Sequence, residues 1–107
     1  MRPKRILAGA TMLAIGLMSV SAHAATIRIS MENLVISPAV AAAKVGDIVE
    51  WINNDVFAHT ATARNGDWEV TLPPKKTGST VLKKAGTIDY YCRFHPNMKA
   101  TLTVEPE

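Results

Sequence analysis

Cys92, His95 and Met98 lie within one seven-residue stretch, and His59 lies upstream of it. A thiolate, two imidazoles and a thioether form a ligand set that suits copper, because sulfur ligands favour Cu(I) and imidazole favours Cu(II). Two histidines and one cysteine with a weak axial methionine describe a copper site for electron transfer. The residue types and their spacing therefore predict a copper site at these four residues.

The strand that leads to this stretch decides where Cys92 points. In residues 87–92 a period of two places Ile88, Tyr90 and Cys92 on one inward face. The chain must then turn, and Pro96 restricts the turn by fixing its own φ and biasing His95 toward extended geometry. One loop thus supplies three of the four candidate side chains. His59, which follows the turn-forming residues 53–55, is placed to supply the fourth.

The first 24 residues have the layout of a secretory signal peptide. A basic start at residues 2–5 precedes an uncharged, mostly apolar run over residues 6–20, and Ala22 and Ala24 place small side chains where a signal peptidase reads them. A membrane anchor is the alternative, but the run is shorter than the roughly 20 apolar residues of a spanning helix. We expect export to a bacterial periplasm, with cleavage after Ala24 or, alternatively, after Ala22.

Removal of residues 1–24 changes the charge. The full chain has 12 basic and 9 acidic residues, and three of the basic residues and none of the acidic ones lie in the first 24, so 9 remain against 9 and the net charge falls from +3 to zero. A neutral domain gives no argument for binding to nucleic acid or to a membrane surface. Residues 25–107 are expected to form one domain without a membrane anchor.

That domain contains a single cysteine, which cannot form an internal disulfide. In an oxidising compartment a lone cysteine indicates a reactive thiol, an intermolecular bridge or a metal ligand. The two histidines of residues 25–107 and this cysteine are all in the candidate site. A bound metal would protect the thiol and stabilise a small fold.

Short strands dominate the predicted secondary structure. Residues 39–43, between Pro38 and Gly46, are expected to be irregular or an extended edge segment, and residues 64–76 to be the longest loop. Seven or so short strands without a long helix indicate an all-β sandwich or barrel. The strands are predicted at residues 26–30, 33–36, 48–52, 58–63, 77–82, 87–91 and 100–104.

The sequence resembles the cupredoxins. The resemblance rests on Val45-Gly46-Asp47, Trp51-Ile52-Asn53, His59, Ala85-Gly86-Thr87 and Tyr91-Cys92-x-x-His95-Pro96-x-Met98. Within the family, the short Cys-x-x-His-x-x-Met loop is most similar to that of the amicyanins. The resemblance implies a Greek-key β-sandwich of about seven to eight strands with one type 1 copper ion at one end. It also implies His59, Cys92 and His95 as equatorial ligands and Met98 as the axial one.

Two residues depart from the amicyanin pattern. An asparagine usually follows the first histidine ligand and ties the two ligand segments together, and here that residue is Thr60, whose hydroxyl can make a similar bond. A proline usually precedes the second histidine, and here that residue is Phe94. Because Phe94 has a backbone N–H, we hypothesise that it bonds the Cys92 sulfur and raises the reduction potential.

Two surface features allow a role in docking. Four lysines flank one predicted strand and form either a solvated face or a weak docking patch for an acidic redox partner; they are Lys75, Lys76, Lys83 and Lys84. Phe94 and Pro96, with Pro73 and Pro74, are candidates for an apolar collar around the edge of His95. In cupredoxins that edge is where electrons enter and leave.

The function that these observations favour is a soluble, monomeric electron carrier and not an enzyme. Its partners would be transient redox proteins such as a dehydrogenase, a cytochrome or an oxidase. One alternative is a periplasmic copper-handling protein, a chaperone, scavenger or resistance factor on the same fold; the absence of further Met or His clusters in residues 25–107 weighs against it. Another alternative is an interaction domain with a zinc-filled or vacant site.

Overall fold

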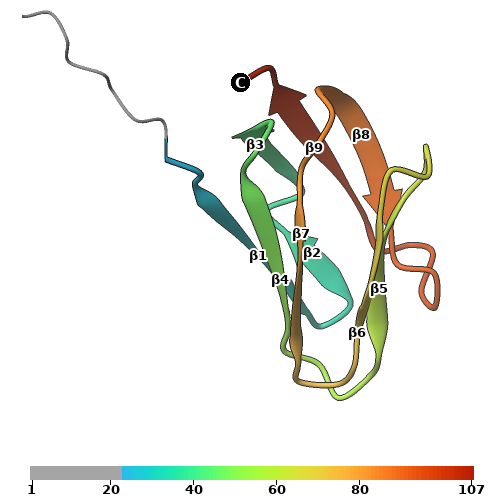
Figure 1. Cartoon of the computed structure of the whole chain (residues 1–107). Coiled ribbons are helices and arrows are strands. Elements are labelled where there is room, and N and C mark those ends of the chain that lie inside the picture. Colours follow the sequence, from blue (N-terminus) through green and yellow to red (C-terminus); the bar gives the residue numbers. More distant parts are fainter. Residues whose placement is uncertain (1–22) are drawn as a thin grey trace, which may run out of the picture.

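Two β-sheets face each other in the part of the chain that the structure, a computed structural model, describes, residues 23–107 (Figure 1). One sheet has the order β2 (Val35–Ser37), β1 (Thr26–Glu32), β4 (Ile48–Asn53) and β7 (Thr77–Val81). The other has the order β3 (Val40–Lys44), β9 (Lys99–Glu105), β8 (Gly86–Tyr91), β5 (His59–Ala63) and β6 (Glu69–Leu72). The predicted all-β sandwich is confirmed.

The predicted signal peptide lies outside the described residues except for His23 and Ala24. Over residues 23–107, no helix has the length and apolar character that crossing a membrane requires.

One strand occurs where a loop was predicted. Residues 64–76 contain β6, which pairs antiparallel with β5 at the edge of its sheet, so the described chain has nine strands. The periodic signal of β6 is weak because only Leu72 of its four residues is fully buried. Residues 39–43 are extended as expected, since β3 forms the opposite edge of that sheet.

Two of the strand pairs are parallel. β1 runs parallel to β4, with Thr26 opposite Ile48, and β3 runs parallel to β9, with Val40 opposite Thr101. The remaining pairs are antiparallel. β9 pairs with β3 on one side and with β8 on the other, so it lies inside the sheet that carries the candidate site.

The core between the sheets contains a cluster of three aromatic rings. Trp51 and Tyr90 are fully buried, and the Trp51 indole N–H donates a hydrogen bond to the Tyr90 hydroxyl oxygen at 3.2 Å. The ring of Trp68, in the segment before β6, lies 5.1 Å from Trp51 and 5.3 Å from Tyr90 between ring centroids. Trp68, whose position the sequence left open, therefore packs against the core. Burial of the phenol raises the pKa of Tyr90 to about 12.

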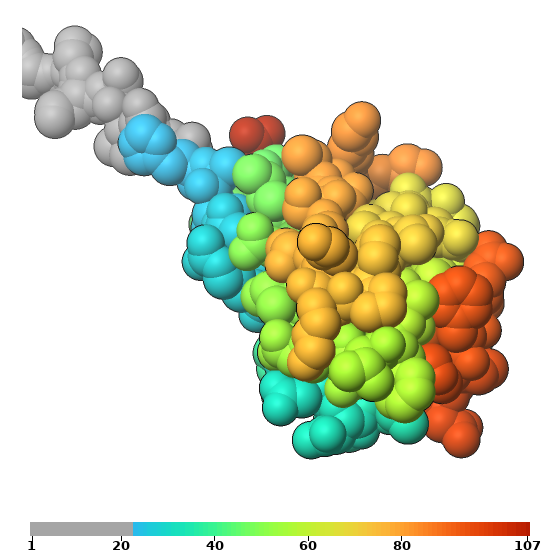
Figure 2. Space-filling view, turned by 90° about the horizontal axis from the view of Figure 1, so that it is seen from below, coloured from blue at the N-terminus to red at the C-terminus, as the bar shows by residue number. Residues whose placement is uncertain are grey.

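Four connections gather at one end of the sandwich. They are the β1–β2, β4–β5, β6–β7 and β8–β9 connections, and Figure 2 shows this end with the β1–β2 turn in cyan, β4–β5 in yellow-green and β8–β9 in orange-red. Contacts between them are direct, because Asn33 donates to the Asp55 side chain and the Phe57 ring lies 5.9 Å from that of His95. The predicted ligand loop therefore lies at the same end as three other connections and contacts the β4–β5 connection through Phe57.

The four lysines lie in two pairs at opposite ends of β7. Lys75 and Lys76 precede β7 at the end where these connections gather, whereas Lys83 and Lys84 follow β7 at its other end. Six residues, of which five form β7, separate the two pairs, and the seven steps from Lys76 to Lys83 correspond to about 23 Å at 3.3 Å per residue. Lys84 instead lies 3.7 Å from Asp67. The alternative of a single docking patch stays a prediction, and it would have to include both ends of β7.

Candidate metal centre

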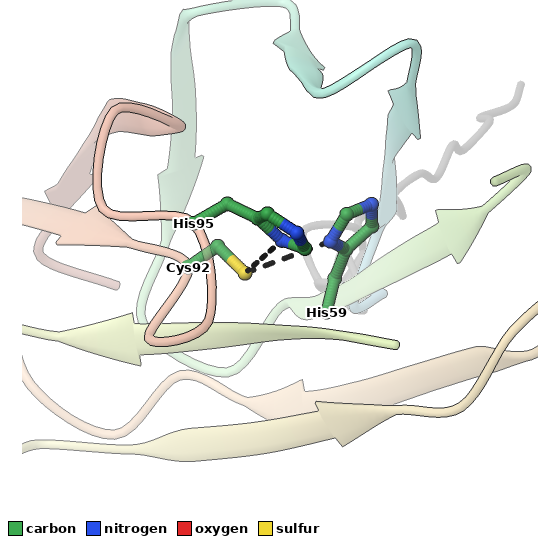
Figure 3. Close-up of side chains that lie close together, drawn as sticks. All are labelled: His59, Cys92 and His95. Carbon is green, nitrogen blue, oxygen red and sulfur yellow. Dashed lines mark hydrogen bonds between the residues drawn. The ribbon is translucent and has the colours of Figure 1, made fainter. Parts of the chain in front are cut away.

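The structure brings His59, Cys92 and His95 together from two parts of the chain. Cys92 follows β8 and His59 begins β5, and the possible ligand atoms of the three residues lie within 4.8 Å of one another. The Cys92 sulfur lies 3.6 Å from Nδ1 of His59 and 3.8 Å from Nδ1 of His95 (Figure 3). Both imidazoles thus present the same ring nitrogen to the thiol.

These separations fit a single metal ion between the three side chains. Bonds of about 2.3 Å to sulfur and about 2.0 Å to nitrogen, meeting at tetrahedral to trigonal angles, would place sulfur and nitrogen roughly 3.5–3.8 Å apart. The observed 3.6 and 3.8 Å agree with this range. His59 and Cys92 are fully buried and His95 is half-buried, so an ion there would have little access to water.

The loop that carries Cys92, His95 and Met98 closes on itself through its backbone. The Cys92 N–H donates to the Met98 carbonyl at 2.9 Å, and the Met98 N–H donates to the His95 carbonyl at 2.8 Å. The His95 N–H in turn donates to the Cys92 carbonyl at 3.2 Å. Met98 is buried, with 2% of its surface exposed, at the start of the return into β9. These backbone hydrogen bonds fix the shape of the loop.

Asp55 orients His59. Nε2 of His59 lies 2.8 Å from the Asp55 carboxylate, which also accepts the backbone N–H groups of Asn33 and Leu34. An ionised carboxylate only accepts hydrogen bonds, so it keeps the imidazole proton on Nε2. Nδ1 is then left with a free lone pair directed at the Cys92 sulfur, which is the arrangement a metal-binding histidine needs.

The ionised state of Asp55 follows from its surroundings. Burial alone would raise the pKa of the carboxyl, but hydrogen bonds from His59, Leu34 and Asn33 outweigh burial and hold the pKa below its ordinary value. Sequence reasoning missed Asp55, because residues 53–55 were interpreted only as a turn. Its position four residues before His59 was the available signal.

Thr60 connects the two segments that carry the candidate ligands. Its hydroxyl oxygen accepts the Arg93 N–H at 2.8 Å and lies 2.8 Å from the Thr62 hydroxyl, and its own N–H donates to the Cys92 sulfur at 3.4 Å. The hydroxyl expected from the sequence to replace the asparagine link therefore makes that link. Arg93 is held further by an ion pair of 2.6 Å with Glu69.

We expect Thr60→Val to loosen this link. The substitution keeps the side-chain shape and removes the acceptor of the partly buried Arg93 N–H, which costs about 1 kcal/mol of unfolding free energy. A chemical denaturation curve measures this change, and Thr60→Ser, which keeps the hydroxyl, is the matched control. Equal stability of the valine and serine variants would contradict a linking role.

The hypothesis about Phe94 does not hold. Within residues 23–107, the backbone N–H that hydrogen-bonds the Cys92 sulfur belongs to Thr60, and none from Phe94 does so. Phe94 lies in the ligand loop and is 55% exposed.

The aromatic ring that the structure places against His95 belongs to Phe57. Phe57 is 51% exposed, and its ring lies edge-on to His95 at 5.9 Å. Val56, next to it, is 69% exposed. From the sequence, the collar was predicted to consist of Phe94 and Pro96 with Pro73 and Pro74. An apolar pair directly after a turn, before a buried histidine, was the signal for Phe57.

A family profile decides the classification of this fold and site. The profile of the cupredoxin-like domain matches residues 5–104. The chain belongs to the cupredoxin-like domain family. The predicted resemblance and the predicted fold class are thus confirmed.

Two curated proteins resemble this cupredoxin in sequence. The methylamine utilization protein MauL of Methylorubrum extorquens is 35% identical over 66 residues, which cover 58% of this chain and 58% of MauL. The amicyanin of Paracoccus denitrificans is 35% identical over 68 residues, which cover 58% of this chain and 52% of amicyanin. The cupredoxin therefore spans little more than half the length of these curated relatives.

Solved amicyanin structures resemble the cupredoxin more completely. A variant in the reduced state is 28% identical, with a TM-score of 0.65, and the match covers 75% of this chain and 82% of that one. Another variant, described as a reduced Cu(I) form, is 27% identical with a TM-score of 0.65, covering 80% and 86%. An oxidized variant has 27% identity and a TM-score of 0.66, covering 75% and 82%.

Proposed function

We propose that this cupredoxin is a periplasmic electron carrier that holds one type 1 copper ion. His59, Cys92 and His95 would be the strong ligands and Met98 the weak axial one. The observation that carries the proposal is the buried thiol with two imidazole Nδ1 atoms at 3.6 and 3.8 Å. A thiolate with two imidazoles and a thioether is a donor set typical of blue copper. The reduced Cu(I) form and the oxidized form among the similar amicyanin structures support both the metal and its two redox states.

Bound copper would supply one-electron chemistry between Cu(II) and Cu(I). The residues of this chain keep the geometry constant while that happens. Asp55 orients His59, the Thr60 hydroxyl connects the two ligand segments, and the backbone bonds of residues 92–98 fix the loop. Burial of Cys92 and His59 keeps bulk water away. A site held in this way reorganises little when its charge changes, which favours fast electron transfer.

His95 is the proposed exit for electrons. It is the half-buried member of the three side chains, and the exposed rings of Phe57 and Phe94 lie on its side of the molecule. A small apolar contact suits brief encounters between redox proteins, whose interfaces are small. The partner would be a dehydrogenase, cytochrome or oxidase, met by a monomeric carrier without enzymatic activity of its own.

We expect Phe57→Ser to slow electron transfer without changing the copper site. The substitution removes apolar contact area beside His95, so the electron self-exchange rate should fall about tenfold, within the range that interface variants span. NMR line broadening in mixtures of the two redox states measures this rate. Val81→Ser is the matched control, because Val81 is 49% exposed at the far end of β7. A rate reduced equally in both variants would contradict the assignment of the exit.

One experiment tests the proposed function as a whole. The exported protein is titrated with Cu(II) while the visible spectrum and the voltammogram are recorded. An intense blue thiolate-to-copper band with reversible voltammetry is the expected result. A colourless protein that binds only Cu(I), or releases it readily to an acceptor, would indicate copper handling instead. Preference for Zn²⁺ with no redox response would reject both functions.

A further inference from the structure

The backbone nitrogen of Ala25 donates a hydrogen bond to a buried carboxylate. It lies 2.9 Å from Oδ1 of Asp47, whose side chain is only 7% exposed. The other carboxylate oxygen accepts the backbone N–H of Lys44 at 2.9 Å. The Ala25 carbonyl accepts the N–H of Ile48 at 2.9 Å, at the start of the β1–β4 pairing. Ala25 is therefore fixed at both its nitrogen and its carbonyl.

Ala25 is also the residue that follows the predicted signal-peptidase site. We propose that cleavage after Ala24 converts this hydrogen bond into an ion pair between the new α-ammonium group of Ala25 and the Asp47 carboxylate. In the cleavage, a signal peptidase uses one water to hydrolyse the Ala24–Ala25 amide, leaving a carboxylate on Ala24 and an amine on Ala25 that takes up a proton. The Asp47 carboxylate would thus be the binding site for the N-terminus that cleavage creates.

The position of Asp47 distinguishes between the two predicted cleavage sites. A cut after Ala22 would leave His23 and Ala24 ahead of Ala25 and would place the ammonium up to about 7 Å further along the chain. An amide N–H would then occupy the Asp47 site, as in the uncleaved chain. Only the cut after Ala24 puts the full charge at Asp47.

The charges around this position support the ion pair. Two pockets at this position, of 260 and 310 Å³, are lined in part by His23 and Ala24, which the proposed cleavage removes. The charged side chains that remain in their lining are those of Lys44, Asp47, Glu105 and Glu107. Three of these are acidic and favour an ammonium, and Lys44 opposes it. Backbone hydrogen bonds from Ala25 and Lys44 already hold the pKa of Asp47 below its ordinary value, so the carboxylate is ionised at neutral pH.

The ion pair predicts a particular dependence of stability on pH. An α-amine normally has a pKa of about 7.7–8.0, and a carboxylate within hydrogen-bond distance raises the pKa in the folded state. The stabilisation is therefore complete below the ordinary value and is lost as the pH rises through the raised value. Ionised Asp47 also contributes, and its contribution is lost as the pH falls through its lowered pKa.

The test uses the full chain exported by a bacterial host. Intact mass identifies the first residue of the processed protein, and the expected mass starts at Ala25. In a matched variant, one glycine is inserted between Ala24 and Ala25, which keeps the Ala25 hydrogen bond but moves the ammonium away. At pH 6 the thermal midpoint of this variant should be lower by about 4 °C or more, and the gap should close above the raised pKa of the amine.

A second variant isolates the partner of the amine. Asp47→Asn should lower the midpoint of the normal protein by more than it lowers that of the glycine-inserted protein, because only the normal protein has an ion pair to lose. Equal effects in the two backgrounds, or a glycine-inserted protein as stable as the normal one at pH 6, would overturn the proposal. A mature protein that starts at His23 would overturn it as well. None of these measurements depends on copper, so failure here leaves the electron-carrier proposal untouched.

Discussion

Cys92→Ser should abolish the blue colour and leave the β-sandwich folded. A serine hydroxyl is not deprotonated at neutral pH and is a poor ligand for either copper oxidation state, so the thiolate-to-copper band should fall to baseline and the reversible voltammetric wave should disappear. The change inserts a slightly more polar group at a fully buried position, which costs the metal-free fold about 1–3 kcal/mol. Visible absorption and far-ultraviolet circular dichroism measure the two effects separately.

Met98→Leu is the matched control for that experiment. Leucine fills the same buried position but offers no thioether, so it should leave an intense band and shift the reduction potential. If the band persists in the serine variant, Cys92 is not a ligand. If it vanishes in both variants, the site depends on four ligands of similar strength, which contradicts the weak axial role proposed for Met98.

Asp55→Ala should damage both the site and the fold. His59 Nε2 would lose its acceptor inside the protein, and the N–H groups of Asn33 and Leu34 would lose theirs at the β1–β2 turn. We expect the free energy of unfolding to fall by about 3 kcal/mol, because each buried group left without a partner costs about 1–3 kcal/mol. Copper affinity should fall about 10–100-fold, as it does when a histidine ligand loses its orienting partner. Denaturation and a competitive copper titration measure these effects.

The conformation of the β1–β2 turn should increase the loss of stability in the Asp55→Ala variant. Asn33 and Leu34 both have positive φ, +55° and +63°, a conformation that a bulky residue such as leucine rarely adopts. The Asp55 carboxylate is the acceptor that holds both N–H groups there. Leu34→Gly removes the backbone strain, and in the Asp55→Ala background it should recover part of the stability but none of the copper affinity. Recovery of both would mean that Asp55 acts on the turn alone.

Asp55→Asn tests whether the carboxylate sets the proton of His59. An asparagine can still accept a hydrogen bond at its oxygen, but its NH₂ group can also donate to Nε2 and move the imidazole proton to Nδ1. Stability should then fall less than in the alanine variant, while copper binding stays weakened. Unchanged affinity in the asparagine variant would show that the charge of Asp55 is not needed.

The sequence predicted the parts of this protein that depend on local periodicity and spacing. The alternation in residues 87–92 correctly placed Tyr90 and Cys92 inside, and the short spacing to His95 correctly brought both side chains to one site. These predictions succeeded because a strand and a short loop fix the directions of their own side chains. The predicted approach of His59 was also correct, although it rested on the resemblance as well as on its position after a turn.

What the sequence did not predict depends on contacts between distant segments. The link from Asp55 to the β1–β2 turn joins residues more than 20 positions apart. β6 was missed because an edge strand with one fully buried residue has little periodic signal. The place of Phe57 against His95 depends on how two connections meet at the end of the sandwich. A single window of sequence carries at most a weak signal for these features, because the contacts that define them join separate windows.

The position of β9 sets the order in which the molecule can assemble. This strand follows the ligand loop in sequence, yet it lies between β3 and β8, so that sheet stays open until residues 99–105 have been inserted. Pairing β9 with β3 closes a chain segment of more than 50 residues, and such distant pairing is slow. Residues 92–98 end where β9 begins, so the loop acquires its final shape only at this late step. We therefore expect a metal that needs the finished loop to bind only after β9 has paired with β8, so that its blue band reports the completed fold.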